Sequence, residues 1–197
     1  MAVIKQKKVG LFFGSFNPIH IGHLAIANYF AEYTELNEVW FVISPHNPLK
    51  EKKSLLHQQH RWYMVNLAIE DYPKFKASDI EFHLPQPSYT IHTLVHLKEK
   101  YPNHQFCLIL GQDNLSTFHK WKNFEVILKN YKIYVYPRPG AAPSEFDKHP
   151  NIILTDAPYI GISSTFIRKA VKEKKDIRFF LHPKVWQHID EMNFYKR

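Results

Sequence analysis

The sequence contains a single cysteine, Cys107, among its 197 residues. One thiol excludes an internal disulfide and any metal site built from several cysteines. Cys107 stands inside the apolar run Phe106–Leu110, which predicts a buried and unreactive side chain rather than a nucleophile. Disulfide and thiol chemistry are therefore not expected of this chain.

Long apolar runs are also missing. No stretch approaches the roughly 20 apolar residues that a membrane-spanning helix needs. Residues 1–8 carry lysines but lack the apolar core of a signal peptide. We therefore expect a cytoplasmic protein without a membrane partner.

The sequence shows no internal repeat, no low-complexity segment and no convincing interdomain linker. A chain of this length can bury one full hydrophobic core. We expect a single domain over residues 1–197, with a C-terminal helical part that begins near residue 163.

Positive charge, by contrast, is in excess. Lys and Arg number 26 against 18 Asp and Glu, a formal net charge of +8, and 13 histidines add charge as the pH falls. This balance suits anionic partners. Nucleotides and nucleic acid both remain open at this point.

Apolar runs that are typical of buried strands alternate along the chain with helical stretches. The expected strands span residues 9–13, 39–43, 77–84, 106–110, 132–136 and 151–155. The expected helices span 22–33, 54–70, 88–100, 123–129, 163–172 and 182–190, with Ser88 and Ser163 as N-caps. This alternation predicts an α/β fold with a doubly wound parallel sheet, whose ligands bind at the carboxyl ends of the strands.

The junction between the first strand and the first helix reads Gly14-Ser15-Phe16-Asn17-Pro18-Ile19-His20-Ile21-Gly22-His23. A glycine at a strand exit lets a ligand approach the backbone closely. The two histidines share one face of a helix start, where free N–H groups and the helix dipole favour phosphate. A zinc half-site is the alternative, but no cysteine or carboxylate nearby completes a ligand set. The stretch therefore predicts a polyphosphate site.

A second phosphate motif reads Gly161-Ile162-Ser163-Ser164-Thr165-Phe166-Ile167-Arg168. Three hydroxyls cluster at a helix start, and an arginine follows about one turn later. Hydroxyl and N–H groups can bind phosphate oxygens, and a guanidinium can hold two of them. Taken alone, the segment is equally an ordinary serine cap followed by a surface arginine.

Polar groups also stand at the end of a further predicted strand and at the start of a further predicted helix. Asp113, in Gly111-Gln112-Asp113-Asn114, follows a strand and could accept ribose hydroxyls or hold a metal through water; the alternative is a turn that bonds its own backbone. Ser88-Tyr89-Thr90 begins a helix whose N–H groups favour a carboxylate over a neutral amide. A capped amphipathic helix would explain the same residues.

Together these motifs resemble a known family. The first is similar to the G-x-F-x-P-x-H-x-G-H signature of nucleotidyltransferases with a His-x-x-His-type motif, and the second to their I-S-S-T-x-[IV]-R signature. Ser88–Leu94 resembles the S-Y-T-x-x-T-L motif of bacterial nicotinate mononucleotide adenylyltransferases, and 111–128 their G-x-D-x-[LM]…W…[IL]-L pattern. The resemblance implies a Rossmann-like nucleotidyltransferase fold. It also implies adenylyl transfer from ATP to nicotinate mononucleotide, giving deamido-NAD and pyrophosphate.

The resemblance also implies the site residues. The catalytic residues would be His20, His23 and Arg168. The ATP-binding residues would be Gly14, Ser15, Phe16, His20, His23, Gly111, Asp113, Ile162, Ser163, Ser164, Thr165 and Arg168. The acceptor-binding residues would be Asn17, His46, Lys50, Arg61, Tyr89, Thr90, Trp121 and Arg138, with Trp121 beside the pyridine ring. No metal would be held by protein side chains, because Mg²⁺ would bridge the phosphates of ATP.

The sequence departs from the family pattern at two places. Ser15 stands where a glycine is common in the bacterial family, and His46 stands earlier than the histidine of the family's P-x-x-P-H-K segment. Nicotinamide mononucleotide or pantetheine phosphate remain alternative acceptors. A basic nucleic-acid-binding module is the alternative outside enzymes, although it does not explain paired phosphate motifs at strand ends. A homo-oligomer stays open.

Overall fold

A computed structural model of the chain describes residues 6–45 and 55–196. Its centre is a six-stranded sheet with the strand order β3-β2-β1-β4-β5-β6, and all five neighbouring pairs are parallel. The strands are β1 (Lys7–Gly14), β2 (Glu38–Ile43), β3 (Phe75–Ser78), β4 (His104–Gly111), β5 (Ile133–Tyr136) and β6 (Ile152–Leu154). The expected parallel α/β sheet is confirmed.

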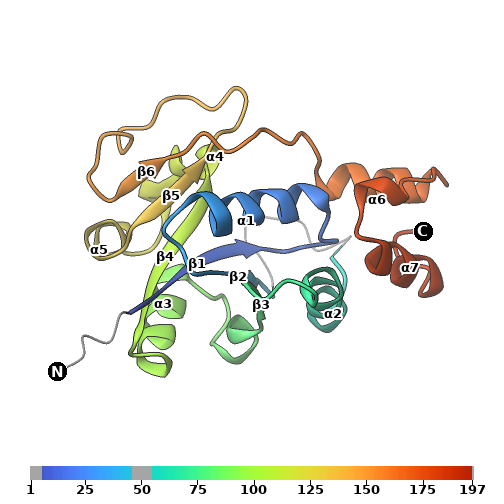
Figure 1. Cartoon of the computed structure of the whole chain (residues 1–197), viewed down its shortest axis with the longest axis horizontal. Coiled ribbons are helices and arrows are strands. Elements are labelled where there is room, and N and C mark those ends of the chain that lie inside the picture. Colours follow the sequence, from blue (N-terminus) through green and yellow to red (C-terminus); the bar gives the residue numbers. More distant parts are fainter. Residues whose placement is uncertain (1–5, 46–54, 197) are drawn as a thin grey trace.

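Helices connect and cover these strands (Figure 1). They are α1 (Ile21–Tyr33), α2 (Gln58–Ile69), α3 (Thr90–Lys100), α4 (Gln112–Leu115), α5 (Phe124–Asn130), α6 (Ser164–Lys172) and α7 (Pro183–Glu191). The described residues also form the short 3₁₀ turns η2 (Ile80–His83), η3 (Phe118–Lys120) and η4 (Arg178–Phe180). Within the described ranges, no helix combines the length and the apolar character needed to cross a membrane.

The two faces of the sheet carry separate hydrophobic cores, which makes the fold doubly wound. Phe12 of β1 packs in the core that contains Phe30 of α1, together with apolar residues of α2, α6 and α7. Its neighbour Leu11 faces the other core, with Leu94 of α3 and apolar residues of α5. Figure 1 shows α1 and α3 on opposite sides of the sheet. Side chains of successive strand residues point to opposite faces, so a run of apolar residues in a buried strand serves both cores.

The third strand is shorter than expected. Residues 77–84 were predicted as a strand, but β3 ends at Ser78 and residues 80–83 form the turn η2. Ile80, Phe82 and Leu84 alternate with polar residues as in a strand. The backbone instead turns, with the N–H of Phe82 bonded to the carbonyl of Asp79 at 2.8 Å, and both Ile80 and Glu81 become buried.

Two expected helix starts also differ. Ser88 does not cap α3, which begins at Thr90 with Tyr89 as its N-cap; the Ser88 hydroxyl donates to the Glu81 carboxylate instead. Helix α2 begins at Gln58, later than the expected start, which lies outside the described residues. The Ser163 cap is confirmed, because its hydroxyl accepts the N–H of Phe166 at 3.1 Å.

Cys107 lies in the core of β4, as its apolar neighbours predict. Its side chain is buried, and burial raises the pKa of the thiol to about 11. The thiolate that would act as a nucleophile is therefore disfavoured at neutral pH.

Candidate active site

The strand–helix junction after β1 is a tight loop closed by one aromatic ring. Phe16 has a φ of 44°, in the left-handed region, and its ring folds back over Gly14. A Cβ on Gly14 would lie 2.8 Å from that ring, so only glycine fits beneath it. The backbone of this loop and the start of α1 therefore lie together at the carboxyl end of β1.

The two histidines of the signature lie against each other at this helix start. His20 is the N-cap of α1, and its ring stacks on that of His23 with centroids 3.8 Å apart. The backbone N–H of His20 donates to Nδ1 of His23 at 3.3 Å. A neutral His23 therefore carries its proton on Nε2, which makes Nε2 a hydrogen-bond donor.

His20 is buried, with 4% of its surface exposed. Burial, and then the charge of Arg138, lowers the pKa of its imidazole to about 4. The ring is therefore neutral at physiological pH. Its Nδ1 is buried and has no hydrogen-bond partner within residues 6–45 and 55–196.

The second phosphate motif meets the first, although 151 residues separate Arg168 from Asn17. Nη1 of Arg168 donates to the carbonyl of Asn17 at 2.9 Å, and the Ser164 hydroxyl donates to the carbonyl of Pro18 at 2.9 Å. These bonds set the N-terminus of α6 against the loop between β1 and α1, residues 15–20, which we call the signature loop. Figure 1 shows α6 beside the end of α1 that carries this loop. The structure thus joins the two motifs in one site.

A third group gathers at the ends of β4 and β5. Gly111 precedes α4, and the Asp113 carboxylate lies close enough to its Cα that a Cβ there would displace the carboxylate. Nε of Arg138 lies 3.7 Å from Oδ1 of Asp113, and its guanidinium lies 5.1 Å from the centre of the Tyr136 ring. Arg138 also contributes to lowering the pKa of His20, so it lies near the histidine pair. Its expected contact with the acceptor stays a prediction.

The expected pyridine-binding residues form a separate group at the start of α3. Tyr89 is partly exposed, and Nζ of Lys122 lies 4.5 Å from the centre of its ring. Trp121, the neighbour of Lys122, is half-buried and packs against Phe118 with ring centroids 5.4 Å apart. The structure therefore brings Tyr89 and Thr90 to the segment that carries Trp121.

Arg61, by contrast, is enclosed by backbone carbonyl groups. Its side chain is fully buried, at 0% exposure. Its donors go to four backbone carbonyls, those of Leu56 (2.9 Å), Ser15 (2.6 Å), Ser44 (2.8 Å) and Pro45 (2.7 Å). These bonds give Arg61 a structural role, because they tie together the loops that follow β1 and β2. Its expected contact with the acceptor phosphate stays a prediction.

Asn17 also has a supporting position. Its side chain is buried, and its Oδ1 accepts from the hydroxyl of Tyr195 at 2.8 Å and from the N–H of Leu56 at 3.3 Å. The expectations for His46 and Lys50 lie outside the described residues. Among those described, no group of three or more His, Cys, Asp or Glu side chains is placed to hold a metal ion.

Two residues that support the site were missed by sequence reasoning. Tyr195 lies far from any motif, and nothing in its surroundings along the chain links it to Asn17. Glu81 fell inside an expected strand, where a carboxylate is normally directed to solvent. The apolar neighbours Ile80 and Phe82 complete an alternating pattern that predicts an exposed Glu81, so the sequence carried no signal of its burial.

Comparison with known proteins agrees with this geometry. The family described as cytidylyltransferase-like matches residues 11–170, so the chain belongs to that class of nucleotidyltransferases. A Flavobacterium johnsoniae protein named probable nicotinate-nucleotide adenylyltransferase is 60% identical over 192 residues, covering 96% of this chain and 100% of that protein. The chain is therefore a member of the nicotinate-nucleotide adenylyltransferase family, as the motifs implied.

Solved structures show the same fold. Plasmodium falciparum nicotinic acid mononucleotide adenylyltransferase complexed with NaAD superposes with a TM-score of 0.81 at 25% identity, covering 96% of this chain and 98% of that one. The same enzyme complexed with APC gives a TM-score of 0.80 with the same coverage. The expected nucleotidyltransferase fold is confirmed.

Proposed function

We propose that this enzyme transfers the adenylyl group of ATP to nicotinate mononucleotide, forming deamido-NAD and pyrophosphate. The family assignment supports this reaction, and the observation that carries it is the junction of the two phosphate motifs through Arg168–Asn17 and Ser164–Pro18. A single triphosphate chain can span the helix starts of α1 and α6 only when they adjoin in this way.

The reaction needs no protein nucleophile. A phosphate oxygen of the mononucleotide attacks the α-phosphorus of ATP, and a new O–P bond forms as the bond from the α-phosphorus to the bridging oxygen breaks. Pyrophosphate leaves with that electron pair. The protein positions the two phosphates in line and stabilises the negative charge of the transition state.

The histidine pair and α6 would divide this task. We assign the Nε2–H of His23 to the oxygens of the α-phosphate, with the neutral ring of His20 stacked behind it. Arg168 and the hydroxyls at the start of α6 would hold the leaving pyrophosphate. Mg²⁺ would arrive bound to ATP, as part of the substrate, and neutralise phosphate charge. Arg138 and Asp113 would contact ATP, the aspartate through ribose hydroxyls.

The acceptor would lie between α3 and the segment that carries Trp121. The free N–H groups at the start of α3, with Tyr89 and Thr90, would bind the pyridine carboxylate. An indole face beside an electron-poor pyridinium ring adds stacking and cation–π attraction. This arrangement would prefer the acid to the neutral amide.

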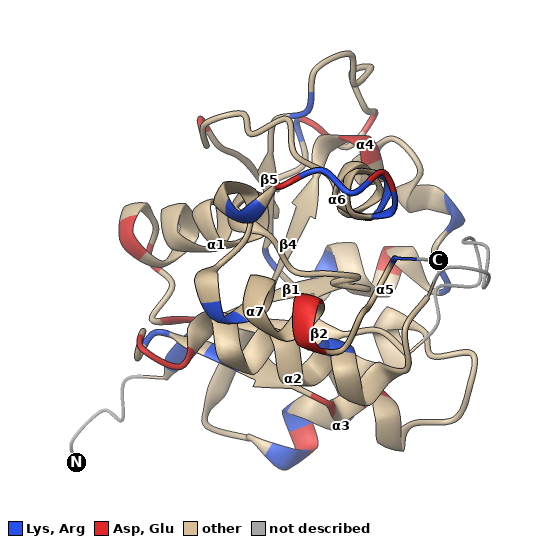
Figure 2. Cartoon of the chain, turned by 90° about the vertical axis from the view of Figure 1, so that its right-hand side faces the viewer, with Lys and Arg blue, Asp and Glu red and all other residues tan. Residues whose placement is uncertain are grey.

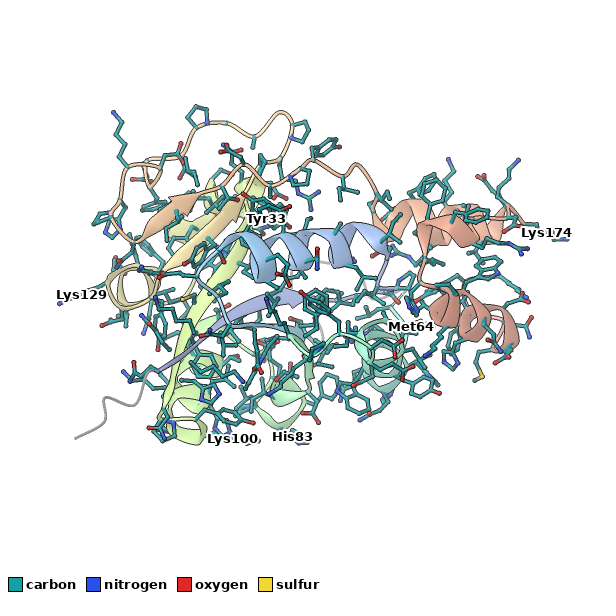
Figure 3. All side chains as sticks on the ribbon, in the orientation of Figure 1. Tyr33, Met64, His83, Lys100, Lys129 and Lys174 are labelled. Carbon is teal, nitrogen blue, oxygen red and sulfur yellow. The ribbon has the colours of Figure 1, made fainter. Side chains whose placement is uncertain are left out.

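Small-molecule substrates account for the positive charge better than nucleic acid does. Several lysines bind carboxylates, as Lys132 does with Glu35 at 2.9 Å. Figure 2 shows Lys and Arg interspersed with Asp and Glu around α6, and Figure 3 places Lys129 and Lys174 at opposite ends of the molecule. Nucleic acid prefers a continuous basic surface. A cytoplasmic location would suit these substrates and the single buried thiol.

The test is pyrophosphate release from ATP and Mg²⁺ with either nicotinate or nicotinamide mononucleotide as acceptor. We expect strong preference for the acid. Equal use of both would keep the adenylyl transfer and reject the carboxylate site. Absence of turnover with either would reject the proposed reaction, and a steep salt dependence of oligonucleotide binding would then favour nucleic acid.

A further inference from the structure

A buried carboxylate lies beside the proposed acceptor site and has no part in the chemistry above. Glu81, in the turn η2, has 3% of its surface exposed. No ion pair joins it to a lysine, arginine or histidine of the described ranges, so hydrogen bonds alone offset its burial.

Three hydroxyl groups supply those hydrogen bonds. Thr93 donates to Oε1 at 2.8 Å, Ser88 donates to Oε2 at 3.2 Å, and the side chain of Ser44 bonds the same carboxylate. Burial raises the pKa of Glu81, while these three bonds oppose that shift by favouring the charged form. An ionised carboxylate suits this position because it only accepts hydrogen bonds and can take all three.

The three donors belong to segments that surround the acceptor site. Ser44 directly follows β2 and is also held by Arg61 through its carbonyl. Ser88 directly precedes Tyr89, and Thr93 lies in the first turns of α3. Glu81 is therefore the point at which the start of α3 is attached to the carboxyl end of β2.

We propose that Glu81 is a positioning residue for the acceptor: by binding Ser44, Ser88 and Thr93 it fixes Tyr89 and the first N–H groups of α3 where they meet the pyridine carboxylate. This inference rests on the proposed function. It predicts that Glu81 governs the KM for nicotinate mononucleotide and the preference for acid over amide. The ATP half of the site, on α1 and α6, should not depend on it.

The chain offers a matched control. Glu38, at the start of β2, is another buried carboxylate, with 6% of its surface exposed. It accepts from Nε1 of Trp40 at 2.9 Å and pairs with Lys7 and Lys76. It lies at the opposite end of β2 from Ser44. Glu38→Gln should therefore lower folding stability without disturbing the start of α3.

The experiment compares Glu81→Gln and Glu38→Gln in the full chain, with kcat and KM measured for ATP and for both mononucleotides, and with thermal unfolding. We expect Glu81→Gln to raise the KM for nicotinate mononucleotide about tenfold, the effect of losing one charge-assisted hydrogen bond, and to lower the acid-to-amide preference. The KM for ATP should stay within about twofold. Glu38→Gln should lower only the unfolding temperature.

Two results would overturn the role of Glu81. One is an equal rise in KM for ATP and for the mononucleotide, and the other is the same kinetic pattern in Glu38→Gln. If Glu81→Gln does not fold, Ser88→Ala and Thr93→Val each remove one donor and should shift the same KM in the same direction. Unchanged KM values in both would then reject the inference. An unmodified enzyme that turns over neither mononucleotide would reject the proposed function as well.

Discussion

The hydroxyl of Tyr195 donates to Oδ1 of Asn17 at 2.8 Å, which joins two residues 178 positions apart in the sequence. Tyr195 follows α7, and Asn17 lies in the signature loop. Burial is the main cause that raises the pKa of Tyr195, so the phenol stays protonated and remains a donor. With Arg168 bonded to the carbonyl of Asn17, the C-terminal segment holds the loop through both side chain and backbone.

Tyr195→Phe should therefore weaken the loop without creating a cavity. We expect a loss of about 1 kcal/mol in the free energy of unfolding, the usual contribution of a buried hydrogen bond, together with a lower kcat. Urea unfolding and steady-state kinetics would measure both. Tyr33→Phe is the control, since Tyr33 is 77% exposed at the C-terminal end of α1 (Figure 3). A kcat unaffected by Tyr195→Phe would show that Asn17 is held without this bond.

His23→Ala tests the catalytic assignment. Removing a donor that acts in the transition state should lower kcat about 100-fold or more while changing the dissociation constant of ATP only slightly. Single-turnover kinetics and equilibrium binding of ATP separate these two quantities. A loss of ATP affinity as large as the loss in kcat would instead assign His23 to ground-state binding.

The buried ring of His20 makes folding stability depend on pH. The unfolded chain protonates this ring below its ordinary pKa of 6.5, whereas the folded chain does so only below about 4. Protons therefore favour the unfolded state between those values, and stability falls as the pH drops through that window. Across this window the free energy of unfolding should fall by at most about 3 kcal/mol. Urea unfolding at pH 7.5 and pH 4.5 should show this loss in the natural chain and a smaller loss in His20→Gln.

Arg61→Lys distinguishes a structural arginine from a phosphate ligand. A lysine cannot reproduce the planar set of donors that reaches four carbonyls, so buried acceptors would lose their partners. We expect the free energy of unfolding to fall by about 2–4 kcal/mol. If Arg61 instead bound the acceptor phosphate, the KM for the mononucleotide would rise and the unfolding temperature would stay constant.

Arg138→Ala tests the placement of this residue beside ATP. The KM for ATP should rise about 5–10-fold, with a smaller change for the mononucleotide, because a charge-assisted contact to ATP is lost. The pKa of His20 should also rise, since Arg138 contributes to lowering it, and NMR titration of the ring would detect this. Arg178→Ala removes an exposed arginine paired with Asp176 and should change neither. A larger rise in the KM for the mononucleotide than for ATP would instead assign Arg138 to the acceptor site.

The sequence predicted those parts of the fold whose local pattern matches their environment. Continuous apolar runs such as residues 106–110 are typical of strands buried on both faces, and β4 contains that run. The prediction of a strand over residues 77–84 was wrong. Their alternation of apolar and polar residues suits a strand, but the backbone turns after β3 and Glu81 becomes buried. Local periodicity does not reveal a buried carboxylate whose partners come from two other segments, the end of β2 and the start of α3.

The same distinction holds for the site. The motifs predicted which segments converge, and the Arg168–Asn17 contact bears out that convergence. They did not predict which side chains support the site rather than face a ligand. Asn17 lies in the signature and Arg61 matched an expected ligand position, yet their partners include Ser44, Leu56 and Tyr195, which carry no signal in the sequence. Support of this kind depends on long-range contacts and becomes visible only in the folded chain.

The fit of the Phe16 ring over Gly14 limits how this enzyme could be redesigned. A Cβ at residue 14 would lie 2.8 Å from the ring, so a larger residue at 14 requires a smaller one at 16. An engineer who wishes to enlarge the entrance for a bulkier nucleotide should therefore begin at residue 16, with a smaller side chain that tolerates a positive φ. Libraries that vary residue 14 alone would bring every new side chain into collision with that ring.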